Sequence, residues 1–334
     1  MSLDFIRQTA RKLGIGRRLQ RLRTYFAVSP LLRLQIMLAQ RRYLGAVFEM
    51  PAIPCGEGPL EVHMLLHSRR FREGAWACYS LLRHTGPGTR LVIHDDGSLQ
   101  PWQLGRLRSL FPGFVHISRE RADREVGQAL EERGLVKCAS LRRGLVFALK
   151  LFDAVFYAKN ERIIIMDSDV LFFTRPEALL RGGCCYSPDN NDQCYCLSTA
   201  KMRALLGMEP VYRFNPGVFA VSPGKIDWQQ HEAWLGEEGF GVVKGRPSYF
   251  AELTLWAMEV SLQGGVPLTP GYEICAPDPS QPGVVFGHYC GGGYWASRLY
   301  THAIPWVYQV LTHSAERVSP HGVFPRAESQ PPAA

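Results

Sequence analysis

Two aspartates separated by one residue are the sequence feature best suited to binding a metal ion. Asp167 and Asp169 follow the apolar run Ile163–Met166, whose consecutive isoleucines are typical of a buried strand. Side chains at positions i and i+2 of an extended chain point to the same side, so both carboxylates are expected in one crevice. Adjacent anions repel each other unless a cation such as Mg²⁺ or Mn²⁺ lies between them. The alternative is that the two aspartates only cap the following turn.

The segments around this pair alternate between short apolar runs and amphipathic stretches. Strands are predicted over Glu61–His67, Thr89–His94, Phe114–Ser118 and Arg162–Met166, and helices over Gly74–His84, Leu99–Phe111 and Ala139–Ala158. Strands buried on both faces and separated by helices are typical of a mainly parallel, Rossmann-like α/β sheet flanked by helices. Ligands of such sheets bind at the carboxyl ends of the strands, where Asp167 and Asp169 are expected.

Four stretches, in order along the chain, resemble motifs of the GT-A glycosyltransferases, and most closely those of the glycogenin-like family 8. Lys150-Leu-Phe152…Tyr157 resembles the K-L-x-x-W…Y helix, and Ile163–Val170 resembles the h-h-h-x-D-x-D-x-L strand. Arg213–Phe219 is similar to the F-N-x-G-V-F segment, and Gly287–Trp295 to the H-F-x-G-x-x-K-P-W segment. The resemblance covers about residues 60–310 and implies a GT-A fold.

The resemblance also implies a site and its roles. Asp167, Asp169 and His288 would hold Mn²⁺ or Mg²⁺, which bridges the diphosphate of a nucleotide-sugar donor. The residues with implied catalytic roles are Glu252, Asn215 and Lys150, and those implied in donor binding are Lys150, Ser168, Asn215, Gly217, Gly291 and Arg298. Glu252 would lie near the reacting carbon, and Gly217 would allow a close approach of the backbone. The alternatives are a structural histidine at 288, a surface lysine at 150 and an Asn-Pro-Gly turn at 215–217.

Three positions differ from the family pattern. His67–Arg70 follows the first strand where the family commonly has an acidic residue, and Glu252-Leu253 replaces an Asp-Gln pair. The last motif lacks its lysine, which leaves Arg298 as the nearest cation for the phosphates. These differences predict a divergent member with a different donor or acceptor.

The positive charge of the chain is concentrated near its N-terminus. Residues 1–45 contain ten Lys or Arg and one acid, a formal charge of +9, whereas the whole chain of 334 residues carries +8. The remainder therefore sums to −1, and no nucleic-acid partner is expected. Apolar residues recur at roughly helical spacing from Phe5 to about Gln40, as in a basic amphipathic helix lying on an anionic membrane surface. The alternative is a helix packed on its own domain.

Composition divides the chain into three parts. Residues 1–50 are predicted to be a basic amphipathic helical extension interrupted at Pro30, and Pro51–Pro54 reads as a linker. The family resemblance implies a GT-A domain over residues 59–313, and the Pro/Ala-rich composition of residues 314–334 predicts disorder.

Nine cysteines accompany no recognisable secretory signal and no apolar run of membrane-spanning length. These features predict free thiols and a cytoplasmic location, peripheral at the inner face of the membrane. Alternatively, the cluster of Cys184, Cys185, Cys194 and Cys196 holds a structural metal, although adjacent cysteines do not match the usual zinc knuckle.

The sequence therefore predicts a metal-dependent glycosyltransferase that moves a hexose from a nucleoside-diphosphate sugar, UDP-hexose first of all, to an acceptor hydroxyl. Retention of configuration is implied by the resemblance, and a glycan or lipid-linked acceptor in envelope or capsule assembly is expected. The alternatives are a haloacid-dehalogenase-type phosphatase and a non-catalytic, transferase-like scaffold that binds a glycan or a protein partner. Release of the nucleoside diphosphate from a nucleotide-sugar would separate the enzyme from both.

Overall fold

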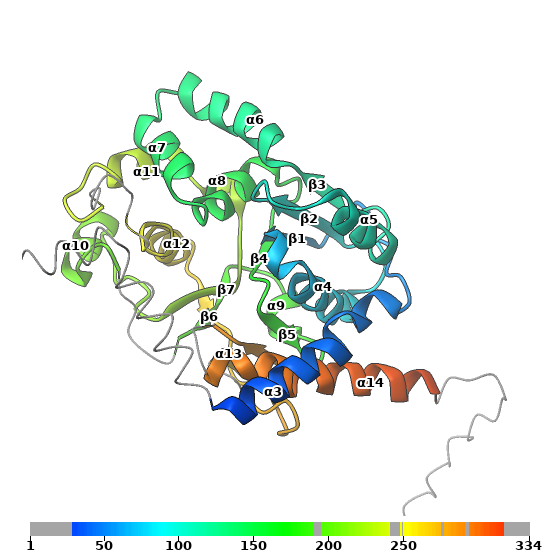
Figure 1. The fold of residues 1–334 in the computed structure, drawn as a ribbon. Helices are drawn as coiled ribbons and strands as arrows, with labels where there is room; N and C mark the ends of the chain where they lie inside the picture. Colours follow the sequence, from blue (N-terminus) through cyan, green and yellow to red (C-terminus); the bar gives the residue numbers. More distant parts are fainter. Residues whose placement is uncertain are drawn as a thin grey trace, which may run out of the picture.

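The computed structural model describes residues 29–189, 195–240, 248, 250–274, 277–290 and 294–316. A central sheet of seven strands has the order β3-β2-β1-β4-β7-β6-β8 (Figure 1). Its strands are β1 (Glu61–Leu66), β2 (Arg90–Asp95), β3 (Val115–Ile117), β4 (Ile163–Met166), β6 (Cys185–Pro188), β7 (Phe214–Val221) and β8 (Val266–Pro267). The four strands from β3 to β4 are mutually parallel, and only β7 runs against both of its neighbours. The mainly parallel α/β sheet expected from the sequence is confirmed.

A smaller sheet begins where β4 ends. It contains β5 (Val170–Phe172), β9 (Tyr272–Ile274) and β10 (Phe286–His288), and β10 lies between the other two strands. β10 runs antiparallel to β5 and pairs His288 with Val170. This pairing brings a segment near residue 288 to the carboxyl end of β4.

Helices cover both faces of the large sheet, because its central strands are apolar on both sides. In β4, Ile164 and Met166 belong to one hydrophobic core and Ile163 and Ile165 to the other. The first core includes α4 (Phe71–Thr85), α5 (Pro101–Leu110), α9 (Glu177–Leu180) and α14 (Ile304–Glu316). The second includes α6 (Arg119–Glu132), α7 (Val136–Gly144), α8 (Ala148–Tyr157), α10 (Thr199–Leu206), α11 (Trp228–Trp234) and α12 (Ala251–Leu262), and Figure 1 shows several of these beside the sheet.

Two helical predictions need correction. The long helix expected over Ala139–Ala158 is two helices, because the helix ends at Gly144 and Leu145 adopts an extended conformation (φ −132°, ψ 111°). Glycine is a poor helix former, and the break turns Val146 and Phe147 outward, with 48% and 39% of their surfaces exposed. The sequence reasoning also missed α6, whose N-cap Ser118 accepts a hydrogen bond from the amide of Arg121.

The described N-terminal region starts with α3 (Pro30–Ala39), which continues through η1 (Gln40–Leu44) and η2 (Ala46–Glu49). Pro30 is the first residue of α3, where its fixed φ suits a helix start, and Ser29 caps it. Residues of η1 and η2 such as Leu44 and Val47 are buried in the core beside α4. The rest of the expected extension, residues 1–28, and most of the expected tail lie outside the described residues.

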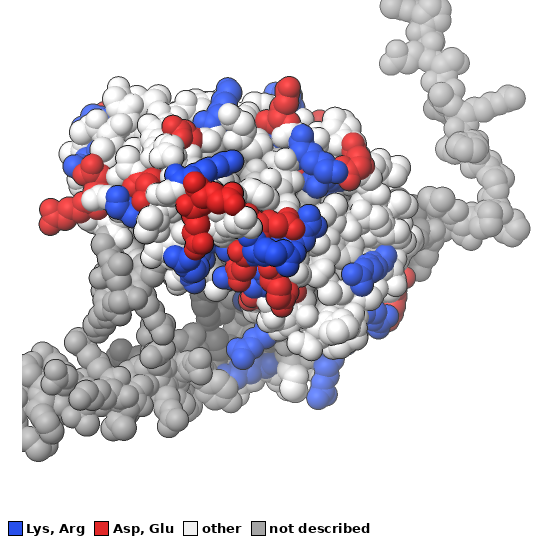
Figure 2. Space-filling model, turned by 90° about the horizontal axis from the view of Figure 1, so that it is seen from above, with Lys and Arg blue, Asp and Glu red and all other residues white. Residues whose placement is uncertain are grey.

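Every helix within the described ranges is too short or too polar to cross a lipid bilayer. On the face seen from above, over which α6 runs, acidic and basic side chains are interspersed (Figure 2). Several of them form ion pairs along or beside α6, including Arg119–Asp123 at 2.8 Å and Arg121–Glu125 at 3.0 Å. This face therefore carries no continuous basic patch.

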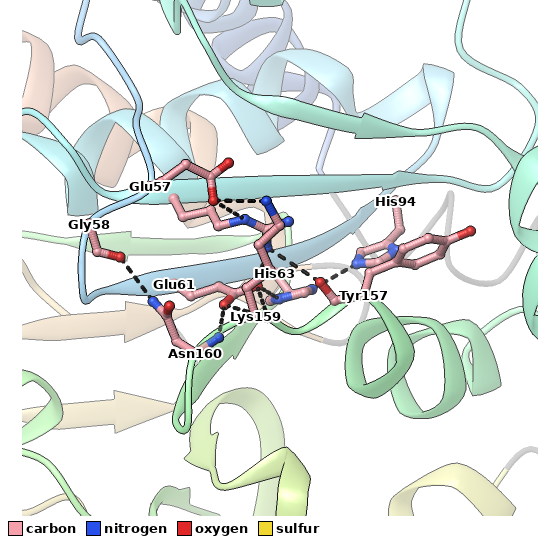
Figure 3. A network of polar contacts seen from close by, with 9 residues as sticks. Glu57, Gly58, Glu61, His63, His94, Tyr157, Lys159 and Asn160 are labelled. Carbon is pink, nitrogen blue, oxygen red and sulfur yellow. Dashed lines mark hydrogen bonds and ion pairs between the residues drawn. The ribbon is translucent and has the colours of Figure 1, made fainter.

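A buried polar network ties the start of β1 to the loop that precedes β4 (Figure 3). The carboxylate of Glu61 accepts hydrogen bonds from the amides of Lys159 (3.0 Å) and Asn160 (2.7 Å) and pairs with Arg90. His63 lies between Glu61 and His94, at 2.8 Å from each. Burial lowers the pKa of both histidines, which are therefore neutral at pH 7. The network fixes the entry into β4 from the end opposite to Asp167.

Candidate active site

The Asp167–Asp169 turn is held by two other strands. The amide of Asp167 donates to the carbonyl of Gly217 in β7 (2.8 Å), and the amide of Tyr289, just after β10, donates to the carbonyl of Asp169 (2.9 Å). The side chains of Asp167 and Asp169 keep 27% and 23% of their surface exposed. Both carboxylates are thus fixed in position and accessible at the carboxyl end of β4, as the sequence predicts.

His288 joins the two aspartates from β10. One potential ligand atom from each of Asp167, Asp169 and His288 lies within 4.8 Å of the other two. Nε2 of His288 is 3.3 Å from Oδ1 of Asp169. Burial opposes charge on both groups, but their mutual attraction outweighs it, lowering the pKa of Asp169 to about 2 and raising that of His288 well above its usual value.

Asn215 in β7 orients the imidazole of His288. Oδ1 of Asn215 is 2.8 Å from Nδ1 of His288 and also accepts a hydrogen bond from the amide of Gly217 (2.9 Å). Since Oδ1 can only accept, Nδ1 must carry the proton, and Nε2 is directed toward the aspartates. Asn215 therefore contacts the nitrogen of His288 that faces away from the aspartates, and it is not among the residues that line the cavity.

Asp189 extends this chain of contacts and was missed as a site residue. Its Oδ2 accepts a hydrogen bond from Nδ2 of Asn215 (2.8 Å), which fixes which way the amide faces. Asp189 follows the short strand β6, in a Cys- and Asn-rich stretch that gives no strand signal. No local signal in the sequence therefore singles out Asp189.

Lys150 and Glu252 form a buried ion pair beside Asp167. Nζ of Lys150 lies 3.0 Å from Oδ1 of Asp167 and 3.6 Å from Oε1 of Glu252, and the Lys150 and Glu252 side chains are only 3% and 5% exposed. Burial opposes the charge of Lys150, but the carboxylates of Asp167 and Glu252 raise its pKa. Burial raises the pKa of Glu252 to about 7, against the effect of Lys150. α8 and α12 thus bring these two residues together.

A cavity of about 260 Å³ opens over Asp167, Ser168 and Asp169. Its other walls include Lys150, the two residues at the α7–α8 break (Val146 and Phe147), and His67, Arg70 and Asp96 from the ends of β1 and β2. Arg70 is one of the cations that lower the pKa of Asp169, although burial has the larger, opposite effect. The His67–Arg70 segment that differs from the family pattern therefore lines the cavity.

Four of the six predicted donor-binding residues are not among the described residues that line this cavity: Asn215, Gly217, Gly291 and Arg298. Asn215 and Gly217 contact His288 instead. Gly291 lies outside the described residues. Arg298, in α13 (Tyr294–Arg298), is not among the residues that line the cavity, and its buried Nε has no hydrogen-bond partner in the described part of the chain.

The donor set fits a hard divalent cation. Two carboxylates and an imidazole nitrogen are ligands that Mn²⁺ accepts, and both aspartates remain open to the cavity. Oε1 of Glu252 is buried 3.6 Å from Nζ of Lys150 and has no hydrogen-bond partner in the described ranges. The residues thus suit a metal together with a polar ligand.

The cysteine cluster gives no comparable arrangement. Cys194 lies outside the described residues, and Cys184, Cys185 and Cys196 are free thiols. Within the described ranges, the only group of three side chains close enough to share an ion is Asp167, Asp169 and His288.

No protein-family model matches the sequence, and no curated protein matches it. Solved structures similar to this chain include the galactosyltransferase LgtC in complex with donor and acceptor sugar analogues, at 14% identity and a TM-score of 0.44, covering 76% of this chain and 96% of that one. Mouse xyloside xylosyltransferase 1 is 13% identical with a TM-score of 0.43, covering 75% and 93%. The glycosyltransferase GlyE of Streptococcus pneumoniae TIGR4 is 14% identical with a TM-score of 0.44, covering 76% and 64%.

Proposed function

We propose that this chain is a metal-dependent glycosyltransferase that moves a hexose from a nucleoside-diphosphate sugar to an acceptor hydroxyl. The observation that carries the proposal is the convergence of His288 from β10 with Asp167 and Asp169, which follow β4 and line a cavity of about 260 Å³. The ion pair of Lys150 and Glu252 beside Asp167 supports it. Of these five residues, four lie in the family-like motifs of the sequence, and Glu252 lies outside them.

In this proposal Asp167, Asp169 and His288 hold Mn²⁺ or Mg²⁺. The ion would supply Lewis-acid stabilisation of the negative charge that develops on the departing diphosphate. Asn215, supported by Asp189, keeps Nε2 of His288 available by holding the proton on Nδ1. Ser168 lies between the two aspartates in the chain, and Gly217 lies against His288 in space. Both are proposed to border the diphosphate and the donor sugar.

Lys150 and Glu252 are proposed to act at the sugar. Lys150 balances the charge of Asp167 and Glu252, which keeps both carboxylates close to each other. Oε1 of Glu252 pairs with Lys150 and has no hydrogen-bond partner in the described ranges. We assign Glu252 to accept a hydrogen bond from a hydroxyl of the donor, close to the reacting carbon. We propose that the donor is a UDP-hexose and that the hexose is transferred with retention of configuration.

The acceptor is proposed to be a glycan or lipid-linked molecule in envelope or capsule assembly, with the enzyme in the cytoplasm at the inner face of the membrane. Gly291 and Arg298 remain proposed contacts of the diphosphate. A phosphatase or a binding scaffold would leave a nucleotide-sugar intact, so product analysis separates these alternatives from the proposal.

The test combines binding with turnover. UDP should raise the melting temperature in the presence of Mn²⁺ but only weakly in its absence, and UDP-hexoses should be converted to UDP. Asp169→Asn, which removes one anionic ligand, should abolish both effects while the apo protein melts as before. Glu238→Gln neutralises an exposed carboxylate elsewhere and is the matched control. Near-native turnover by Asp169→Asn would refute the metal assignment.

A further inference from the structure

The helix α3 presents apolar side chains to solvent. Leu31, Leu34 and Leu38 are 66%, 46% and 53% exposed, and Met37 is 42% exposed. Spacings of three and four residues place the three leucines on one side of the helix. α3 contributes no buried residue, and its less exposed positions, such as Leu32 and Ile36, lie on the opposite side. A helix on a soluble protein normally has the reverse arrangement.

Basic residues accompany this apolar face. Arg41 and Arg42 follow α3 in η1 and are exposed, and Glu49 is the single acidic residue between positions 29 and 50. The sequence directly before α3, residues 1–28, contains seven Lys or Arg and one acid, Asp4. Exposed leucines flanked by arginines match a bilayer surface that is apolar inside and anionic outside. A second copy of this basic segment would repel the first, so charge favours an anionic membrane as the surface that covers the apolar face of α3.

α3 is also connected to the candidate active site. η5 (Leu299–Ala303) packs against α3, and Figure 1 shows α3 crossing the C-terminal helices. η5 contributes the hydroxyl of Tyr300, which is hydrogen-bonded to Oε1 of Glu73 in α4 (2.7 Å). The same hydroxyl accepts a hydrogen bond from Nη1 of Arg70 (3.0 Å), and Arg70 lines the cavity over the aspartates. Two side chains therefore link η5, which packs against α3, to the cavity wall.

We infer that α3 is a membrane-docking helix that inserts Leu31, Leu34, Met37 and Leu38 at the headgroup boundary of an anionic bilayer. The contacts through Tyr300 and Arg70 then hold the cavity close to the lipid surface. A lipid-linked acceptor would meet the cavity without leaving the membrane, and this statement about the acceptor rests on the proposed function. The docking itself does not require any catalytic activity.

The experiment measures co-sedimentation of the full chain with vesicles. Wild type should bind mixed phosphatidylcholine–phosphatidylglycerol vesicles more tightly than pure phosphatidylcholine vesicles, and added salt should weaken this binding by screening charge. The triple variant Leu31→Gln, Leu34→Gln, Leu38→Gln should lose about tenfold or more in affinity, because it removes the inserted side chains and keeps every charge. Its circular dichroism and melting temperature should match wild type, since the three leucines are exposed.

The matched control changes three exposed apolar residues elsewhere, Val136→Gln, Met208→Gln and Leu262→Gln, and should bind vesicles like wild type. Equal binding by the α3 variant and wild type would overturn the inference and assign any binding to residues 1–28. A wild-type dimer that dissociates in the α3 variant would also overturn it, because the face would then cover a second copy. UDP release measured without vesicles tests the proposed function separately.

Discussion

The imidazole of His288 lies against Gly217, and this contact leaves no room for a side chain at position 217. A methyl group added at Gly217 would lie 2.3 Å from Nδ1 and 2.5 Å from Cε1 of His288. Nonbonded heavy atoms do not approach so closely, so steric exclusion requires glycine at position 217. The position of the third candidate metal ligand therefore depends on a glycine at 217.

Gly217→Ala should accordingly displace His288 and weaken Mn²⁺ binding. We expect a loss of about tenfold or more in Mn²⁺ affinity, measured by calorimetry, because the ligand set loses its geometry while all three ligands remain. Gly224→Ala is the control, since a methyl group there would meet nothing within 4 Å. If Gly217→Ala bound Mn²⁺ like wild type, His288 would not be a ligand.

Asn215→Ala should weaken metal binding by about 10–100-fold, because Nδ1 of His288 loses its acceptor and the imidazole its fixed tautomer. Asp189→Asn should act in the same direction and more weakly, since it disturbs only the orientation of the amide. Calorimetric titration with Mn²⁺ measures both effects. Asn160→Ala, at the opposite end of the sheet, should leave Mn²⁺ affinity unchanged, and an equal loss there would indicate general destabilisation.

Glu252→Gln should separate catalysis from binding. We expect turnover to fall by about 100-fold or more while Mn²⁺ and UDP bind as in wild type, because the amide keeps the shape but not the charge. Because burial raises the pKa of Glu252 to about 7, wild-type turnover should rise between pH 6 and 8 if the carboxylate acts ionised. Glu259→Gln, on the same helix but paired with His231, is the matched control for UDP-release assays. Unchanged turnover in Glu252→Gln would remove this residue from the site.

The buried His63–His94 pair predicts a loss of stability in mild acid. Burial lowers the pKa of each below the ordinary value of 6.5, so below pH 6.5 the unfolded chain binds protons that the folded chain does not. Stability should fall by up to about 2 kcal/mol between pH 6.5 and 5.5 from this pair, measured by urea denaturation. Glu252 has the opposite effect in this range, so the Glu252→Gln background is used.

His84 contributes to the same fall in stability with falling pH. Burial, together with the charges of Arg83 and Arg175, lowers its pKa to about 4. His84→Gln should therefore remove only about a third of the acid effect. His288, whose pKa is raised, loses its stabilising contribution mainly as the pH rises above 6.5 and interferes little here. If His84→Gln abolished the whole slope, the buried pair would not be its source.

Local patterns predicted the parts of the site that depend on neighbouring residues. The apolar run Ile163–Met166 is a strand, as its local pattern predicts, and Asp167 and Asp169 follow it at an accessible edge. The expected extended chain through the two aspartates is wrong, because Ser168 and Asp169 lie in a turn. The helix over Ala139–Ala158 was also predicted wrongly. Its apolar spacing continues through Gly144, but glycine is a poor helix former and the helix ends there.

Tertiary structure alone decided which distant residues meet. Lys150 and Glu252 are separated by 102 positions, and Asp189 approaches Asn215 across two strands of the sheet, so neither pair has a local signal. Likewise, the sequence placed leucines and arginines on one N-terminal helix but could not say which side of it faces solvent. Periodicity fixes the angles between side chains around a helix, whereas the direction in which they point depends on the surfaces against which the helix packs.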